Sequence, residues 1–211
     1  MTSQPQLASA DLVKVPARYW EALPKEAGDT LQRNASAESH PKGLIVRFLN
    51  EDLLLDREER CLRYSKGNRW EPFRYPLLEL ISLVFLLNAS PNSPDGTLVS
   101  VAELKSAHFF QGPHELKVGS LIKRYGHDIK GFGERAESLG GKAQEMADAA
   151  YKLPALPKVP LYYLFWEGDE EFGAHLSILF DRTVERHLPA DGIWGLVCLV
   201  SDAILRGRLI P

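Results

Sequence analysis

Four carboxylates crowd into one short stretch in the last quarter of the chain. They are Glu167, Asp169, Glu170 and Glu171, and they lie between Trp166 and Phe172. Like charges this close repel one another, and a bound cation or a basic ligand lowers that cost. Carboxylate oxygens are preferred ligands of Mg²⁺ and Ca²⁺, and paired carboxylates also serve as general acids and bases. Three interpretations follow: a solvated acidic turn, a site for a cation or basic ligand, and an acid–base catalytic site.

Neighbouring residues extend this candidate site. The ligand-binding candidates are Trp166, Asp169, Glu170, Glu171, Phe172, His175 and Asp181, of which Asp169, Glu171 and Asp181 are the metal-ligand candidates. If the flanking segments pair as strands, Asp181 returns to the start of the first strand, so the carboxylates form two sites or none. A metal-dependent hydrolase would need Asp169, Glu171, Asp181 and His175 to converge within about 5 Å of one cation.

Other chemistry has little support in the sequence. The two cysteines, Cys61 and Cys198, stand alone in their surroundings, so no iron–sulfur cluster is expected. No cofactor is evident from the pattern, and a divalent cation is the candidate to test. No phosphate-binding loop, nucleophile elbow or C-x-x-C motif occurs in the sequence. The absence of a catalytic signature favours a binding protein over an enzyme.

Two strands must position the acidic stretch. Residues 161–166 form the strongest strand pattern in the chain, Leu-Tyr-Tyr-Leu-Phe-Trp, and residues 175–180 return as its partner. The acidic stretch is then the connection of a hairpin. The aromatic residues alternate between the two faces of the first strand, and an exposed aromatic face would make the chain a protein-interaction module.

The remaining pattern mixes strands and helices. Strands are predicted at 43–49, 53–55 and 61–64, with a further short strand at 98–104 and an ambiguous segment at 146–153. A core helix is predicted over 76–88, two helices over 113–125 and 127–139, and a final helix from near Asp191.

These elements define the fold class and the domains. Strands group near 43–64 and 146–180 without regular alternation with helices, which predicts an α+β fold with a mainly antiparallel sheet packed with helices. We expect residues 1–8 to be a loose tail and 9–211 to form a single domain, in which 113–140 is a possible helical subdomain.

The composition limits the classes of partner that the chain is expected to bind. The chain of 211 residues has 25 basic and 28 acidic side chains and a net charge of −3, so it has no global positive field for a nucleic acid. The first residues lack the basic and apolar pattern of a signal peptide, and no apolar run is long enough to span a membrane. We therefore expect a cytoplasmic protein that binds neither nucleic acid nor membrane.

Several stretches together resemble a known family. They are Leu156–Pro160, Trp166–Phe172, Ile178–Asp181 and His187-Leu188, supported by Phe48, Tyr75–Leu78, Val99–Leu104 and Leu139–Gly141. Over roughly 40 to 205 they are similar to an uncharacterised family of anaerobic bacteria and archaea, catalogued only as a domain of unknown function. Some relatives carry an added cysteine-rich iron–sulfur segment, which this sequence lacks.

The resemblance implies a metabolic context for the chain but no particular activity. It places the chain near anaerobic one-carbon and corrinoid metabolism, with a protein partner there. The function is therefore unknown, and a non-enzymatic ligand-binding or accessory protein of anaerobic metabolism is our first hypothesis. The alternatives are the metal-dependent hydrolase and the protein-interaction module.

Overall fold

The fold is built on two antiparallel sheets of five strands each. The computed structural model describes residues 13–23 and 29–208, and the tail expected at 1–8 lies outside them. Sheet A runs in chain order, β1-β2-β3-β4-β5, and sheet B has the order β6-β10-β9-β8-β7. The α+β class with antiparallel pairing is confirmed, but the strands form two sheets and not one.

Sheet A is a meander of short hairpins. Its strands are β1 (Glu38–His40), β2 (Gly43–Phe48), β3 (Glu51–Asp56), β4 (Cys61–Lys66) and β5 (Arg69–Phe73). In β2 the buried residues Leu44, Val46 and Phe48 alternate with the more exposed Ile45 and Arg47. This period of two buries one face of the sheet against the rest of the molecule and leaves the other outside.

Sheet B carries the acidic hairpin. Its strands are β6 (Leu98–Ser100), β7 (Lys142–Gln144), β8 (Ala149–Leu156), β9 (Val159–Trp166) and β10 (His175–Asp181). The ambiguous segment at 146–153 therefore enters a strand at Ala149. The strand predicted at 98–104 ends at Ser100, where the chain turns into a 3₁₀-helix.

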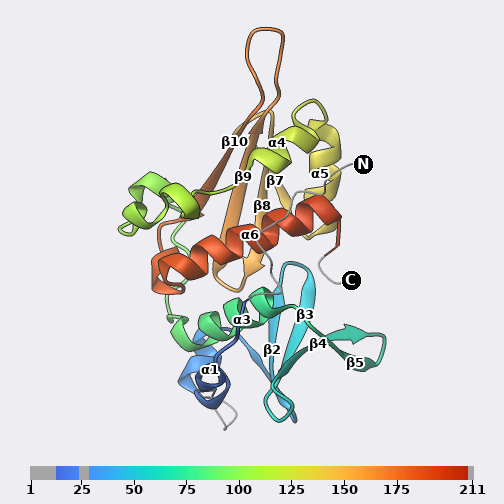
Figure 1. The fold of residues 1–211 in the computed structure, drawn as a ribbon, viewed down its shortest axis with the longest axis vertical. Coiled ribbons are helices and arrows are strands. Elements are labelled where there is room, and N and C mark those ends of the chain that lie inside the picture. The colour runs from blue at the N-terminus through green and yellow to red at the C-terminus, as the bar shows by residue number, and fades with distance from the viewer. Residues whose placement is uncertain (1–12, 24–28, 209–211) are drawn as a thin grey trace.

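Helices cover one face of the molecule. They are α1 (Ala17–Glu21), α2 (Thr30–Asn34), α3 (Pro76–Asn88), α4 (Gly119–Tyr125), α5 (Ile129–Ser138) and α6 (Ala190–Arg206), with 3₁₀ turns at Val101–Glu103, Ala107–Phe109, Gly112–His114 and Val184–Arg186. In Figure 1, α4, α5 and α6 lie in front of sheet B and α3 in front of sheet A. Helix α3 packs against α6, which joins the helical coverings of the two sheets.

The core is continuous across both sheets. Buried side chains from β2, β9, α3 and α6 belong to one cluster, and Leu121, Tyr125 and Phe132 from the predicted subdomain at 113–140 belong to it as well. A second, small cluster of Ala150, Tyr162 and Leu164 lies on the opposite face of sheet B. Residues Leu161, Tyr163 and Phe165 thus face the helices, and their neighbours in β9 face the other side.

Helix boundaries differ from the sequence pattern at two places. The helix predicted over 113–125 begins only at Gly119, because the chain before it forms a separate 3₁₀ turn at Gly112–His114. The final helix begins at Ala190, with Asp191 in its first turn and Pro189 as its N-cap. Proline fits this position because the first backbone N–H groups of a helix have no partner within it.

Candidate functional site

A long connection, residues 167–174, joins β9 to β10 and projects from the end of sheet B (Figure 1). Asp169 organises its tip: one carboxylate oxygen accepts the N–H of Phe172 at 2.6 Å and that of Glu171 at 2.8 Å. The N–H of Asp169 in turn donates to the carbonyl oxygen of Phe172 at 2.8 Å. The N–H groups of Phe172 and Glu171 lower the pKa of the Asp169 carboxyl. Asp169 therefore holds the turn.

The base of the same connection is tied to neighbouring loops. The N–H of Gly168 donates to the carbonyl oxygen of Gly126 at 3.1 Å, between α4 and α5. The N–H of Glu167 donates to the carboxylate of Asp148 at 3.0 Å, in the loop between β7 and β8. A Cβ atom at Gly168 would lie 2.7 Å from the backbone nitrogen of Ala174, so glycine is required there. These bonds fix the direction in which the tip points.

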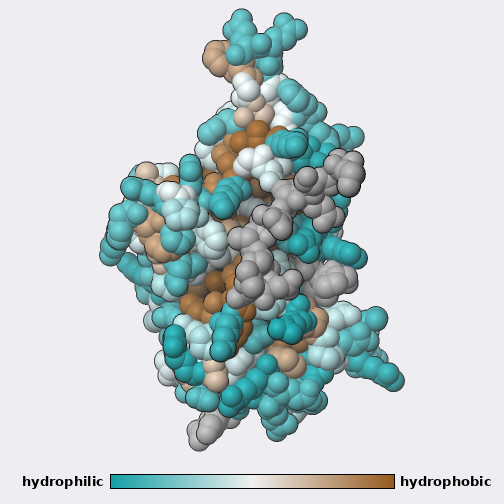
Figure 2. Space-filling model, viewed as in Figure 1, coloured by the Kyte–Doolittle hydropathy of each residue, from teal (hydrophilic) through white to brown (hydrophobic). Residues whose placement is uncertain are grey.

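Two large hydrophobic side chains are exposed at this end of sheet B. Phe172 is 70% exposed at the tip and Met146 is 40% exposed in the β7–β8 loop, and no other large hydrophobic side chain in the described part of the chain is this exposed. We call residues 145–148 and 167–174 the acidic end of sheet B. Figure 2 shows its projecting tip as hydrophilic with a hydrophobic patch.

Charge surrounds these two side chains. The acidic end holds six carboxylates, those of Glu145, Asp148, Glu167, Asp169, Glu170 and Glu171, and contains no Lys or Arg. None of the six forms an ion pair with the described residues. An apolar anchor inside a ring of one charge is a feature of surfaces that recognise a partner.

Trp166 and His175 lie at the base of the hairpin. They face each other across the β9–β10 pair, with ring centroids 5.4 Å apart and ring planes at 34°. The Nε2 atom of His175 is 2.9 Å from the hydroxyl oxygen of Ser177, on the same face of β10. Trp166 packs against the small hydrophobic cluster of Ala150, Tyr162 and Leu164 on this face of sheet B.

Asp181 lies away from the hairpin tip and is buried. The register pairs His175 with Trp166 and Phe180 with Leu161, so six residues of strand, about 20 Å, separate His175 from Asp181. The Asp181 carboxylate accepts hydrogen bonds from the N–H groups of Asp95, Gly96 and Thr183 and from the Thr183 hydroxyl. Asp169, Glu171, His175 and Asp181 do not converge, so the single four-ligand cation site that the hydrolase hypothesis required is not formed.

The aromatic strand is not a docking face. Tyr163 and Phe165 are fully buried and Tyr162 is 7% exposed, which leaves only the partly buried Trp166 of the four rings near solvent. The Tyr163 hydroxyl contacts Ser201 of α6 at 3.0 Å, so this ring packs into the main core. The interaction-module hypothesis therefore needs another surface, and the exposed Phe172 provides it.

A second cluster of possible metal ligands is occupied by internal partners. One ligand atom each of Asp56, Glu59 and Cys61 lies within 4.8 Å of the others. The Asp56 carboxylate, however, accepts the side chain of Arg63 at 2.8 Å and the backbone N–H of Glu59 at 3.1 Å. Burial raises the pKa of Asp56, but these hydrogen bonds outweigh it and lower the pKa overall. This carboxylate is a structural ion-pair partner.

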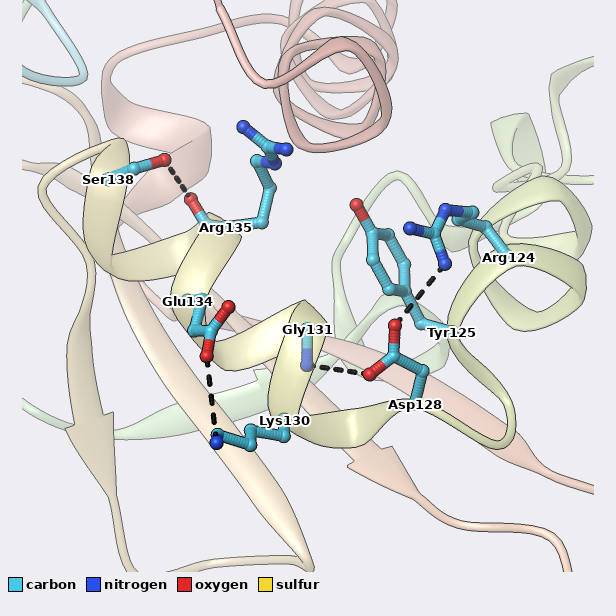
Figure 3. Close-up of a pocket in the computed structure, with 8 residues that line it drawn as sticks. All are labelled: Arg124, Tyr125, Asp128, Lys130, Gly131, Glu134, Arg135 and Ser138. Carbon is cyan, nitrogen blue, oxygen red and sulfur yellow. Dashed lines mark hydrogen bonds and ion pairs between the residues drawn. The ribbon is translucent and has the colours of Figure 1, made fainter.

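The groove along α5 is polar, and two ion pairs lie within it (Figure 3). It has a volume of about 370 Å³ and lies beside α4 and α5. Within it Arg124 pairs with Asp128 at 3.3 Å, and Lys130 lies 4.0 Å from Glu134. Arg135 points away from these pairs toward the end of α6, where it donates to the carbonyl oxygen of Gly207. Four of the five charged side chains in this groove pair with one another, and the fifth, Arg135, donates to a backbone carbonyl oxygen, which makes the groove a weaker candidate than the acidic end.

Sequence reasoning located the hairpin and missed its neighbour. Met146 is a large hydrophobic residue in a polar stretch, with Gln144 and Glu145 before it and Asp148 two positions after it, and this is a signal for an exposed loop hydrophobe. The pattern alone also fitted a helix or a strand. The Asp148–Glu167 hydrogen bond that brings the two loops together is non-local and leaves no trace in the sequence.

The fold and the site define a class: an α+β protein of two antiparallel sheets that presents an acidic, apolar-tipped hairpin. The chain belongs to the family described as a domain of unknown function, DUF3786, whose model matches residues 29–203. Searches of the curated proteins and of the solved structures found no match. Within the described residues, no helix has the length and apolarity that crossing a membrane requires.

Proposed function

We propose that this chain is a non-enzymatic binding protein that docks on a partner protein through the acidic end of sheet B. The observation that carries the proposal is Phe172, a large aromatic side chain 70% exposed on a turn that Asp169 locks. An aromatic anchor held in one conformation loses little entropy on binding, and such anchors dominate interface energetics.

The surface defines the chemistry of the partner. Phe172 and Met146 require an apolar pocket, and the surrounding carboxylates require Lys or Arg at the rim of that pocket. Met146, in the loop bonded to the base of the same hairpin, adds a second exposed and adaptable hydrophobic side chain. The carboxylates of Glu170 and Glu171 speed the encounter by attraction, so docking weakens as salt increases.

Other expectations belong to this proposal as predictions. The accessory role in anaerobic one-carbon metabolism, the cytoplasmic location and the lack of nucleic-acid binding follow from the family resemblance and the net charge of −3. Identifying the protein that the chain binds in cells would test the accessory role in anaerobic one-carbon metabolism.

Site-specific photocrosslinking in the source cells tests the docking surface. A benzophenone amino acid replaces Phe172 in the full chain, and in a control it replaces Asn68, at the tip of the β4–β5 hairpin on sheet A. We expect a discrete adduct from position 172 that the control lacks and that Glu170→Lys with Glu171→Lys removes. The matched reversal Glu58→Lys, in the exposed β3–β4 turn, leaves the adduct unchanged. Equal labelling from both tips would refute the proposal.

A further inference from the structure

A groove lies at the other end of sheet B, where the two sheets meet. It has a volume of about 550 Å³, and its walls include Ile45 from β2 and Pro154, Pro157 and Pro160 from the β8–β9 hairpin. Pro94, from the loop before β6, belongs to the same lining. A pocket of this size with mainly apolar walls accommodates a large side chain and its neighbours.

The groove also carries positive charge. Arg47, Lys152 and Lys158 contribute to its lining, together with the carboxylates of Glu38 and Asp52. Arg47 neutralises Asp52 at 3.2 Å. Lys152 has its amino group 5.6 Å from the centroid of the Tyr162 ring and forms no ion pair with the described residues.

The walls of the groove are held in place from both sides. The N–H of Leu49, after β2, donates to the carbonyl oxygen of Ala155 in β8 at 3.2 Å, which links the two sheets directly. The amino group of Lys158 donates to the carbonyl oxygen of Asn34 at 2.7 Å and lies 3.4 Å from that of Ser90. The prolines add fixed backbone angles, so the groove is formed before any ligand arrives.

This groove has the chemistry that the acidic end requires of its partner. The acidic end presents an exposed aromatic ring among carboxylates, and the groove presents apolar walls with Lys and Arg. The two lie at opposite ends of β9, at least about 20 Å apart along the strand from Pro160 to Trp166, so one chain cannot fill its own groove.

We infer that the partner includes a second copy of this chain: Phe172 of one copy inserts into the groove of the next, with Glu170 and Glu171 facing Lys152, a lining cation that forms no ion pair with the described residues. The inference rests on the proposed docking role of the acidic end. Such a contact joins two different surfaces and is heterologous, so a pair joined by one contact keeps a free hairpin on one copy and a free groove on the other. Assembly therefore continues as a filament unless the last free hairpin enters the first free groove and closes a ring.

Sedimentation of the purified full chain tests the inference. We expect the average mass of the wild-type chain to rise with concentration from about 1 µM to about 1 mM and to fall when salt is added. Phe172→Ala weakens the association at least about tenfold, as loss of a central anchor does. The groove variant Lys152→Glu also weakens it, whereas the exposed sheet A variant Lys66→Glu does not.

Mixing the two defective variants gives the decisive result. The Phe172→Ala chain retains an intact groove and the groove variant retains an intact hairpin, so the mixture forms a one-to-one dimer that cannot grow. Circular dichroism confirms that each variant is folded. A wild-type chain that stays monomeric at every concentration, or a mixture without the dimer, overturns the inference. Photocrosslinking at position 172 to a different protein would then still support the proposed docking role, because it is measured separately.

Discussion

The substitution Asp181→Asn tests whether the Asp181 carboxylate stabilises the fold, as its hydrogen bonds indicate, or binds a ligand. One oxygen of Asp181 accepts the Gly96 N–H at 2.8 Å, and the other accepts the N–H and the hydroxyl of Thr183 at 3.0 and 2.7 Å. An asparagine of the same size keeps an oxygen toward Thr183 but turns an NH₂ group toward the Gly96 N–H. One charge-assisted hydrogen bond is lost and the others are weakened.

The expected cost follows from those contacts. A hydrogen bond to a charged group contributes about 1.5–3 kcal/mol, so the full loss of one and the weakening of others lower the free energy of unfolding by about 2–4 kcal/mol. For a chain of this size, that change lowers Tm by roughly 4–16 °C. Asp181→Ala removes every acceptor of this buried side chain and is expected to cost more.

The effect depends on pH with a definite sign. Burial raises the pKa of the Asp181 carboxyl, but the hydrogen bonds from Thr183, Gly96 and Asp95 outweigh it, and the pKa in the folded state lies below its ordinary value of 3.8. The stabilisation is therefore fully present above the unfolded pKa and is lost as the pH falls through the folded one. The difference between wild type and Asp181→Asn is constant at neutral pH and shrinks below about pH 4.

Urea unfolding followed by tryptophan fluorescence measures both effects. The control is Asp52→Asn, whose side chain is 47% exposed in a surface pair with Arg47 and which is expected to change stability by less than about 1 kcal/mol. If Asp181→Asn unfolds at the wild-type midpoint, or if its deficit persists unchanged in acid, the structural role assigned to this carboxylate is wrong.

Three further predictions concern the scaffold. Gly43→Ala places a Cβ atom against the carbonyl oxygen of Leu55, and we expect it to lower the free energy of unfolding by about 3 kcal/mol, as measured in urea. The control Gly119→Ala has open space around the new Cβ atom and is expected not to lower it. Equal losses of stability in the two variants would contradict this. Lys158→Met removes hydrogen bonds to backbone carbonyl oxygens and is expected to lower stability by about 1–3 kcal/mol, and an unchanged Tm would count against that tie. Partial burial raises the pKa of the Cys198 thiol to about 11, so at about pH 8 we expect it to react with a thiol reagent at least about a hundredfold more slowly than free cysteine, and rapid labelling of Cys198 in the native chain would contradict this.

The local sequence pattern predicted individual strands and helices but not which faces of them are covered. The alternation in residues 161–166 and 175–180 predicted the β9–β10 hairpin, and the apolar run at 76–88 predicted α3, because both depend on spacing within one element. The same alternation misled the interpretation of the aromatic face. Tyr163 and Phe165 face the main core, and Tyr162 belongs to a small cluster on the other face of sheet B. The sequence of β9 does not show which segments cover its two faces.

Composition and short-range periodicity were enough to predict the α+β class and the place of the acidic stretch between two strands, and the family followed from the similarity of particular stretches. The role of each carboxylate depends on the folded arrangement. The antiparallel register carries Asp181 away from the tip, and the Asp148–Glu167 bond brings Met146 to the side of sheet B where Phe172 projects. The physical reason is that exposure and juxtaposition depend on which distant segments pack together, and hydrogen bonds between loops far apart in the chain fix that packing.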